Sequence, residues 1–446
     1  MKGKNLIRLD PTLLGENVLG FERFLQSNII GQRMAIKRLV DAYALSFSSL
    51  RPDNEPIFAG IFLGPSGVGK TKTAEMVSKF IFHDENAMTK IACAEYIESH
   101  QISRLFGSPP GYIGYDDNRD GKERNPSLLS QRKINEYCNQ RALDYAKKND
   151  PETKKNLSLI DELDEQRNKI RSHIANLAKT GTKENLDKIE SERGLLKMLD
   201  EQHDRLVDRY IGRISRITAH LPDYSLVLFD EVEKAHPRIL DALLEITSKA
   251  QATMSNGEKT SFRDSFVIMT SNIGSAEIAD SLKGKHSIGF ANSAESSVYN
   301  IAMEELKKYF RPELIGRIKE NVVVFDQLSH SDLRKIIGIQ IKQLAYRMLY
   351  RGKISVTVHP RVNRFIFERS CDHPQYGARL IEQKIQSYIS KPLAKLSGSG
   401  QISIGDSVLI DVDQKNDRLI FLKEESNSSK IIIPNESMVE AFNLDS

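Results

Sequence analysis

The stretch from Gly64 to Thr71, GPSGVGKT, constrains the fold of this chain more than any other. It fits G-x-x-x-x-G-K-[ST], a loop whose backbone N–H groups surround phosphate oxygens. Residues 57–63 before it read as a short buried strand, and Lys72–Phe82 after it reads as a helix with one apolar face. That helix directs its positive dipole end at the same anion. The sequence therefore predicts a nucleotide site at a strand end of an α/β domain.

Two side chains of this loop carry chemistry of their own. Lys70 offers a mobile cation to the β- and γ-phosphates, and Thr71 offers a hydroxyl to Mg²⁺. We therefore expect ATP and Mg²⁺ as cofactors. The candidate nucleotide-binding residues of the loop are Gly64, Pro65, Ser66, Gly67, Val68, Gly69, Lys70 and Thr71.

The bulk composition limits the remaining function classes. A net charge of +4 over 446 residues gives no argument for a nucleic-acid partner or a membrane surface. No run approaches the roughly 20 apolar residues of a membrane span, and the first residues lack the apolar core of a signal peptide. Cys93, Cys138 and Cys371 are too far apart in sequence to indicate zinc or a disulfide framework. We expect a cytoplasmic protein of two or three domains.

Strand-like and helical segments alternate around the loop. Beyond residues 57–63, four short apolar runs read as strands, at 89–95, 225–229, 265–270 and 322–325. This alternation predicts a three-layer α/β domain with a parallel sheet.

The domain boundaries follow from the same pattern. We place the large ATPase domain at residues 18–328, after a polar lead at 1–17. A small α+β lid domain at 329–424 is helical from Ser331 and ends in two strand-like pieces. A tail follows at 425–446.

Residues 119–219 form an insertion of different character, dense in charged residues and without a strand pattern. Two runs have helical apolar spacing, with Arg167 as one polar position in the first seam. Because Lys179–Thr182 separates the runs, we expect an antiparallel, coiled-coil-like helical hairpin. The alternative is a single solvated surface helix or a partly disordered insert.

Polar residues follow two of the expected strands. Asp230 and Glu231 come directly after 225–229, and Asn272 follows 265–270. Open α/β sheets bind ligands at these ends. We assign Asp230 to Mg²⁺ and Glu231 to the attacking water, and Asn272 to the water or the γ-phosphate.

Several longer motifs carry a resemblance to a known family. They are the P-loop; 107–115 (GSPPGYIGY); 228–237 (LFDEVEKAHP); 269–275 (MTSNIGS); 310–318 (FRPELIGRI); and 376–379 (YGAR). In this order they resemble the Clp family of AAA+ protein unfoldases, and among two-module members the second, C-terminal ATPase module. The resemblance runs from about residue 17 to residue 422.

The resemblance implies roles around the nucleotide. Ile29 and Ile30 are similar to the family's adenine-side box. Asn272 matches sensor 1, and Arg379 matches sensor 2, which contacts the γ-phosphate. Arg317 matches the arginine finger offered to a neighbouring subunit, so the resemblance implies a homo-hexamer.

It also implies contacts with other proteins. Tyr112 and Ile113 match the axial pore loop that grips a protein substrate. The tripeptide Ile288-Gly289-Phe290 is similar to the segment by which some members dock a Clp-type peptidase, the alternative being an incidental apolar loop.

The chain also departs from the family. Asp116–Asp120 replaces the Gly-Gly-Gln-Leu run after the pore loop, and the 119–219 insertion follows. We expect no first ATPase module and no N-terminal receptor domain. The leading hypothesis is a hexameric ATP-dependent unfoldase or remodelling chaperone that threads polypeptide, with the insertion as a docking site for an adaptor, a substrate or a subunit. The alternative is a nucleotide-regulated assembly or adaptor protein without processive unfolding.

Overall fold

A computed structural model describes residue 10 and residues 13–48, 50–108, 126–180, 183–219, 221–275, 277–278, 291–370 and 377–423. Tyr112 and Ile113 lie outside these residues, as does the tripeptide Ile288-Gly289-Phe290. The chain divides into two compact units, one of residues 1–131 with 226–446 and one of residues 132–225, and each is described by itself. None of the helices in the described parts of the chain is long and apolar enough to cross a membrane.

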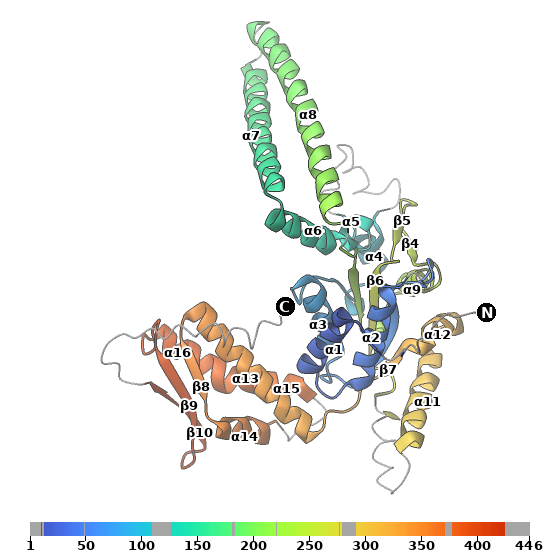
Figure 1. Ribbon diagram of the computed structural model, residues 1–446, viewed down its shortest axis with the longest axis vertical. Helices are drawn as coiled ribbons and strands as arrows, with labels where there is room; N and C mark the ends of the chain where they lie inside the picture. The colour runs from blue at the N-terminus through green and yellow to red at the C-terminus, as the bar shows by residue number, and fades with distance from the viewer. Residues whose placement is uncertain are drawn as a thin grey trace, which may run out of the picture. The chain divides into compact units, whose positions relative to one another are not determined.

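A five-stranded parallel sheet forms the centre of the larger unit (Figure 1). Its strand order is β2-β3-β6-β1-β7, so the chain leaves the P-loop strand β1 and later returns to both of its sides. The strands are β1 (Phe58–Leu63), β2 (Thr89–Ala92), β3 (Ser225–Asp230), β6 (Ser265–Ser271) and β7 (Val322–Val324). The predicted parallel α/β sheet is confirmed.

Register places the ends of the central strands together. Leu63 at the end of β1 is paired with Ser271 of β6, and Asp230 at the end of β3 is paired with Ala92 of β2. The P-loop and the polar residues after β3 and β6 therefore start from one edge of the sheet, as expected for parallel strands.

Helices pack on this sheet through apolar faces. The helix α2 contacts β1 and β7, α3 contacts β6, and α12 contacts β1. Every residue of β6 is buried, which fits a strand covered on both sides. The helices are α1 (Glu16–Asn28), α2 (Arg33–Ser46), α3 (Lys70–Phe82), α4 (Ser99–Phe106), α9 (Pro237–Lys249), α11 (Ala291–Tyr309) and α12 (Pro312–Ile318).

Two local predictions were wrong, and one hairpin was missed. The strand predicted at 89–95 ends at Ala92, because its partner β3 ends at Asp230, and a 3₁₀ turn, Cys93–Glu95, follows. The helix α1 begins at Glu16, inside the predicted lead. The hairpin of β4 (Gln251–Thr253) and β5 (Lys259–Ser261) was not predicted, since its strands are too short for a visible alternation.

The C-terminal part has its own core. Buried side chains from α13, α14, α15, α16 and β9 form one cluster that includes Ile337, Ile366 and Ile410. Its sheet has the order β10-β9-β8 and mixes antiparallel and parallel pairs. The elements are α13 (His330–Gly352), β8 (Ser355–Val358), α14 (Pro360–Glu368), α15 (Gly377–Ile385), the π-helical turn Gln386–Ser390, α16 (Lys391–Gly398), β9 (Ser407–Asp413) and β10 (Arg418–Lys423). The expected small α+β domain is confirmed, although β8 lies in a region predicted to be helical.

The second unit is the expected helical hairpin (Figure 1). After α5 (Gln131–Ile134) and α6 (Glu136–Asn149), α7 (Pro151–Thr180) and α8 (Lys183–Ile217) pack against each other. Two polar contacts join them, the Arg167–Asp200 ion pair at 2.6 Å and the His173–Glu192 contact at 2.5 Å. From the first contact to the second, the residue number rises on α7 and falls on α8. The two helices are therefore antiparallel, which confirms the hairpin over the single-helix alternative.

Candidate nucleotide site

The P-loop joins β1 to α3 through a backbone that needs glycine. Gly69 precedes the first residue of α3 with φ of 106°, a value that residues with a side chain rarely adopt. Its carbonyl accepts both the backbone N–H and the hydroxyl of Thr73, each at 2.9 Å. The helix therefore starts immediately at Lys70, two residues earlier than predicted.

Lys70 is folded back onto its own loop. Its ammonium donates to the carbonyl oxygens of Gly64 at 2.5 Å and Pro65 at 2.8 Å, and to Oδ1 of Asn272 at 2.9 Å. An ammonium has three protons, so these three acceptors satisfy it fully. A phosphate must replace at least one of them when a nucleotide binds.

The environment of Lys70 perturbs its ionisation. The side chain is buried, and burial lowers the pKa of Lys70 to about 8. The carboxylates of Glu233, Asp230 and Glu231 act in the opposite direction without cancelling the effect. Because burial disfavours the charged form of Lys70, negatively charged phosphate oxygens would stabilise its ammonium.

Thr71 and Asp230 face each other across the sheet edge. The Thr71 hydroxyl lies 3.4 Å from Oδ1 of Asp230, and that oxygen also accepts the hydroxyl of Thr270. Lys90 approaches the other oxygen of Asp230 at 3.6 Å. Mg²⁺ prefers oxygen ligands and is usually held by one or two protein oxygens together with nucleotide phosphates. The residues present thus fit a magnesium ion beside Thr71 and Asp230.

Glu231 occupies a tight turn after β3. Its φ is 57°, in the left-handed region, and its backbone N–H donates to Oγ1 of Thr270 at 3.1 Å. Its carboxylate pairs with the ammonium of Lys234 at 2.7 Å. The turn leaves the Glu231 side chain half-buried at the strand end, and its predicted role towards the attacking water remains a prediction.

Asn272 and the loop between α1 and α2 complete the surroundings of the P-loop. The backbone N–H of Asn272 donates to Oε1 of Glu233 at 3.2 Å. Ile29 is buried and Ile30 half-buried in the α1–α2 loop. The buried amide of Gln32 in this loop donates to the carbonyls of Val68 at 3.3 Å and Asp326 at 3.0 Å. The predicted adenine-side segment is thereby fastened directly to the P-loop.

The two predicted arginines are exposed. Arg379 lies in the first turn of α15, where its neighbour Ala378 donates a backbone hydrogen bond to the carbonyl of Gly67 at 2.9 Å. Arg317 lies in the last turn of α12 and lines a surface hollow with Leu244 and Glu313. Arg379 therefore follows directly after a residue that is bonded to the P-loop of its own chain, and the assigned roles of both arginines remain predictions.

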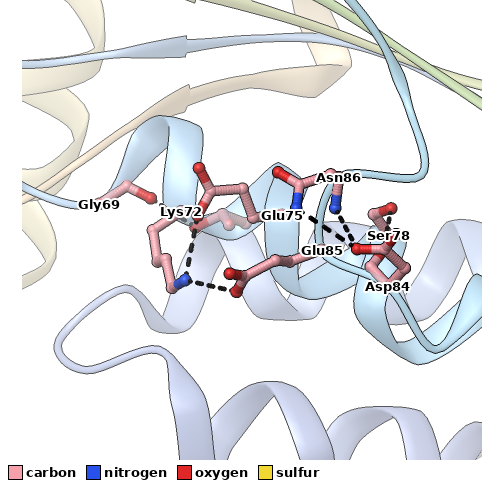
Figure 2. A network of polar contacts seen from close by, with 8 residues as sticks. Gly69, Lys72, Glu75, Ser78, Asp84, Glu85 and Asn86 are labelled. Atoms are coloured by element: carbon pink, nitrogen blue, oxygen red, sulfur yellow. Dashed lines mark hydrogen bonds and ion pairs between the residues drawn. The ribbon is translucent and has the colours of Figure 1, made fainter. Parts of the chain in front are cut away.

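A surface network fixes the helix that follows the P-loop. Figure 2 shows Lys72 between Glu75 at 3.0 Å and Glu85 at 3.2 Å, while Asp84 accepts the backbone N–H of Asn86 at 2.9 Å. Although burial opposes the charge, the two glutamates raise the pKa of Lys72 above its ordinary value. The first turn of α3 is thus tied to the loop that leads to β2.

Thr270 and Glu233 were missed by the sequence analysis. Thr270 contacts both Asp230 and Glu231, and Glu233 contacts Asn272. The available signal was their position: each lies within three residues of a predicted site residue at a strand end. Their roles depend on contacts between β3 and β6, and the sequence of a single strand does not reveal which strand lies next to it.

The fold and this site define an AAA+ ATPase, and the family comparison agrees. A family model described as an AAA domain (Cdc48 subfamily) matches residues 55–127 and 218–321. A second, the C-terminal D2-small domain of ClpB protein, matches residues 328–410. Together they cover more than half of the chain, which belongs to the Clp family of AAA+ ATPases and corresponds to its second module. Nucleotide binding follows from this membership, and the residues between 127 and 218 separate the two matched segments.

Named relatives agree with this membership. The chain is 30% identical over 397 residues to the chaperone protein ClpB of Corynebacterium efficiens, covering 89% of this chain and 33% of the relative. It is 28% identical over 409 residues to chaperone protein ClpB 1 of Thermosynechococcus vestitus, covering 92% and 35%. A ClpA homolog, an ATP-binding subunit of the ATP-dependent Clp protease in Cyanidium caldarium, is 29% identical over 418 residues, covering 92% and 37%. This chain spans about a third of the length of these relatives.

The fold has counterparts among solved structures. The Hsp104:casein complex of S. cerevisiae in its extended conformation has a TM-score of 0.61 and 24% identity to this chain, covering 92% of it and 53% of the Hsp104 chain. At this identity the likeness concerns the fold.

Proposed function

We propose that this chain hydrolyses ATP and uses the cycle to unfold or remodel protein substrates within a hexameric ring. The observation that carries the proposal is the contact of Lys70 with Asn272 beside that of Thr71 with Asp230. At one edge of the sheet, these contacts bring together a lysine that can bind phosphate, two residues that can hold Mg²⁺, and an amide that can contact the γ-phosphate. The names of the relatives as chaperones, and the casein bound by Hsp104, support protein as the substrate.

Each group has a task in the proposed reaction. Lys70 and the P-loop N–H groups hold the β- and γ-phosphates. Thr71 and Asp230 would hold Mg²⁺, which would supply positive charge beside the phosphates. Glu231, whose carboxylate pairs with Lys234 in this structure, accepts a proton from the attacking water. Arg317 from a neighbouring chain and Arg379 stabilise charge on the γ-phosphate.

Glu231→Gln tests the hydrolytic step. The variant should bind ATP within about threefold of the unaltered chain and lose about 10²–10⁴ in kcat, because the amide cannot accept the proton. Glu85→Gln is a matched control, since Glu85 is an exposed partner of Lys72 in the loop that follows α3. Unchanged turnover in Glu231→Gln would remove Glu231 from the reaction.

Tyr112→Ala tests the mechanical step. We expect it to retain ATP hydrolysis and to lose unfolding of a tagged fluorescent protein, because the predicted pore loop would no longer grip the chain. Unfolding at the rate of the unaltered protein would contradict threading and favour the role of a nucleotide-regulated assembly protein.

The helical arm, α7 and α8, is the proposed docking site for an adaptor, a substrate or a neighbouring subunit. Its position between the two matched segments of the family model, and the exposed Leu195 and Met198 on α8, support this role. Deletion of residues 156–215, with ATPase, hexamer formation and substrate unfolding measured, tests it. Persistence of all three at unaltered levels would exclude substrate and subunit docking.

Peptidase docking through Ile288-Gly289-Phe290 remains a separate prediction. Co-purification with a Clp-type peptidase should occur with the intact tripeptide and fail after Phe290→Ala. Equal co-purification with both chains would exclude this segment.

A further inference from the structure

Glu233 is a carboxylate inside the nucleotide site that no predicted role uses. It lies in the 3₁₀ turn Val232–Lys234 that follows Glu231. One oxygen, Oε1, accepts the backbone N–H of Asn272 at 3.2 Å. The other, Oε2, is buried and has no hydrogen-bond partner among the described residues. A buried carboxylate oxygen without a partner costs free energy, so its retention here calls for a reason.

The backbone at Asn272 explains why the contact matters. Ser271 is the last residue of β6 with a strand partner, Leu63 of β1. The N–H of Asn272 therefore lies just beyond the ladder of the sheet. Glu233 supplies the acceptor that the sheet no longer provides, and so it fixes the point where the Asn272 side chain leaves the strand.

The same asparagine holds the P-loop lysine. Of the three acceptors around Lys70, two are carbonyls of the loop itself, at Gly64 and Pro65, and the third is Oδ1 of Asn272. Glu233, Asn272 and Lys70 thus form a continuous chain of hydrogen bonds from the end of β3, across the end of β6, to the P-loop. Phosphate binding to Lys70 would free the Asn272 amide while its backbone stays held.

We propose that Glu233 is a positioning residue for ATP hydrolysis, which holds the backbone of Asn272 so that its amide, released from Lys70, meets the γ-phosphate and the attacking water. This inference rests on the proposed ATPase function. Glu233 acts through Asn272 and does not itself touch the reacting atoms. Since nucleotide affinity depends mainly on the P-loop, loss of Glu233 should lower kcat and leave KM nearly unchanged.

Two variants of the full chain separate positioning from a general structural effect. Glu233→Ala removes the acceptor, and we expect kcat to fall about 10–100-fold, as for a misplaced catalytic group, with KM within about threefold. Glu233→Gln keeps an oxygen that can accept the Asn272 N–H. Its amide nitrogen takes the place of Oε2, which makes no hydrogen bond among the described residues, so no contact is lost there. This variant should restore kcat to within about threefold of the unaltered chain.

A matched control and a double-mutant cycle complete the test. Asp84→Ala removes another carboxylate that accepts a backbone N–H, that of Asn86, outside the site (Figure 2), and should leave kcat and KM unchanged. In an Asn272→Ala background, Glu233→Ala should have less than about a threefold effect, because the group through which it acts is gone. If Glu233→Ala fails to fold by thermal melting, Glu233→Asp, which shortens the reach, replaces it in the same cycle.

Each outcome is decisive. Equal losses in Glu233→Ala and Glu233→Gln, or a full effect of Glu233→Ala without Asn272, would overturn the positioning role and point to the charge of Glu233 instead. A raised KM with normal kcat would overturn it as well. Absence of turnover in the unaltered chain would refute the proposed ATPase function, whereas turnover that Glu233→Ala leaves unchanged refutes only this inference.

Discussion

The buried ammonium of Lys70 should make the stability of the nucleotide-free protein depend on pH in a defined direction. Burial lowers its pKa from 10.5 to about 8, so the folded state binds fewer protons than the unfolded state between these values. Stability must therefore rise with pH across this window, since the unfolded state binds more protons. Below about pH 8 the charged lysine is a net cost to the fold.

The magnitude follows from the same shift. A difference of about 2.5 pKa units corresponds to about 3 kcal/mol in the limit of high pH. Linkage gives a gain of about 2 kcal/mol between about pH 7.5 and about pH 9.5, because the unfolded state is still mostly protonated there. Lys70→Met removes the charge at similar volume and should show none of this gain.

Urea unfolding of both proteins without nucleotide measures the effect. The unfolding free energy of the unaltered chain minus that of Lys70→Met should increase by about 2 kcal/mol over this pH range, and subtraction removes the titration of other groups. Saturating ADP should abolish the increase, because phosphate oxygens favour the charged lysine. A difference that stays flat or falls with pH in the absence of nucleotide would refute the reasoning.

Three further predictions use other features of the fold. Gly69→Ala should lower the free energy of urea unfolding by about 1–3 kcal/mol, because φ is 106° at this position. The cause is the backbone conformation alone, since no atom lies within 4 Å of an added Cβ. Gly194→Ala, in the middle of α8 with equally open space, should instead stabilise its helix by up to about 1 kcal/mol. Arg167→Ala should speed backbone amide hydrogen exchange in peptides of α7 and α8 in the full chain, because it removes the 2.6 Å bond to Asp200 across the hairpin. Unchanged exchange would show that the pair contributes nothing. Cys93 has a pKa raised to about 12 by burial and by nearby carboxylates, so peptide-level mass spectrometry should find its alkylation about a thousandfold slower than that of the unfolded chain near neutral pH, and rapid labelling would contradict its buried position.

Much of the site was predictable because it depends on local order along the chain. Lys70 and Thr71 follow β1, Asp230 is the last residue of β3, and Asn272 follows β6. Polar residues directly after an apolar strand can be recognised in a single sequence, and parallel pairing of the strands brings these residues together. The predicted fold class followed from the same alternation of strands and helices.

The remainder depended on contacts between strands. Thr270 and Glu233 take part only because β3 and β6 are neighbours, an order that the sequence does not state. In the arm, Leu195 fits the helical period of α8 but is 49% exposed, because a two-helix hairpin has only one face to bury. The functions given to Arg317 and Arg379 came from the resemblance, because both arginines lie in helices and neither follows a strand.

The base of the helical arm has a consequence for how the chain folds. Arg213 donates to both oxygens of Asp150, at 2.6 and 2.8 Å, although the two residues are 63 positions apart. The paired strands β2 and β3 are separated by the whole arm, with Thr89 beside Val227. A hairpin that closes locally and is fastened at its base shortens the effective loop between these strands, and so reduces the entropy cost of joining them. The arm would then help β2 and β3 to pair while the chain folds during synthesis. Chains cut within the arm should therefore assemble their central sheet more slowly.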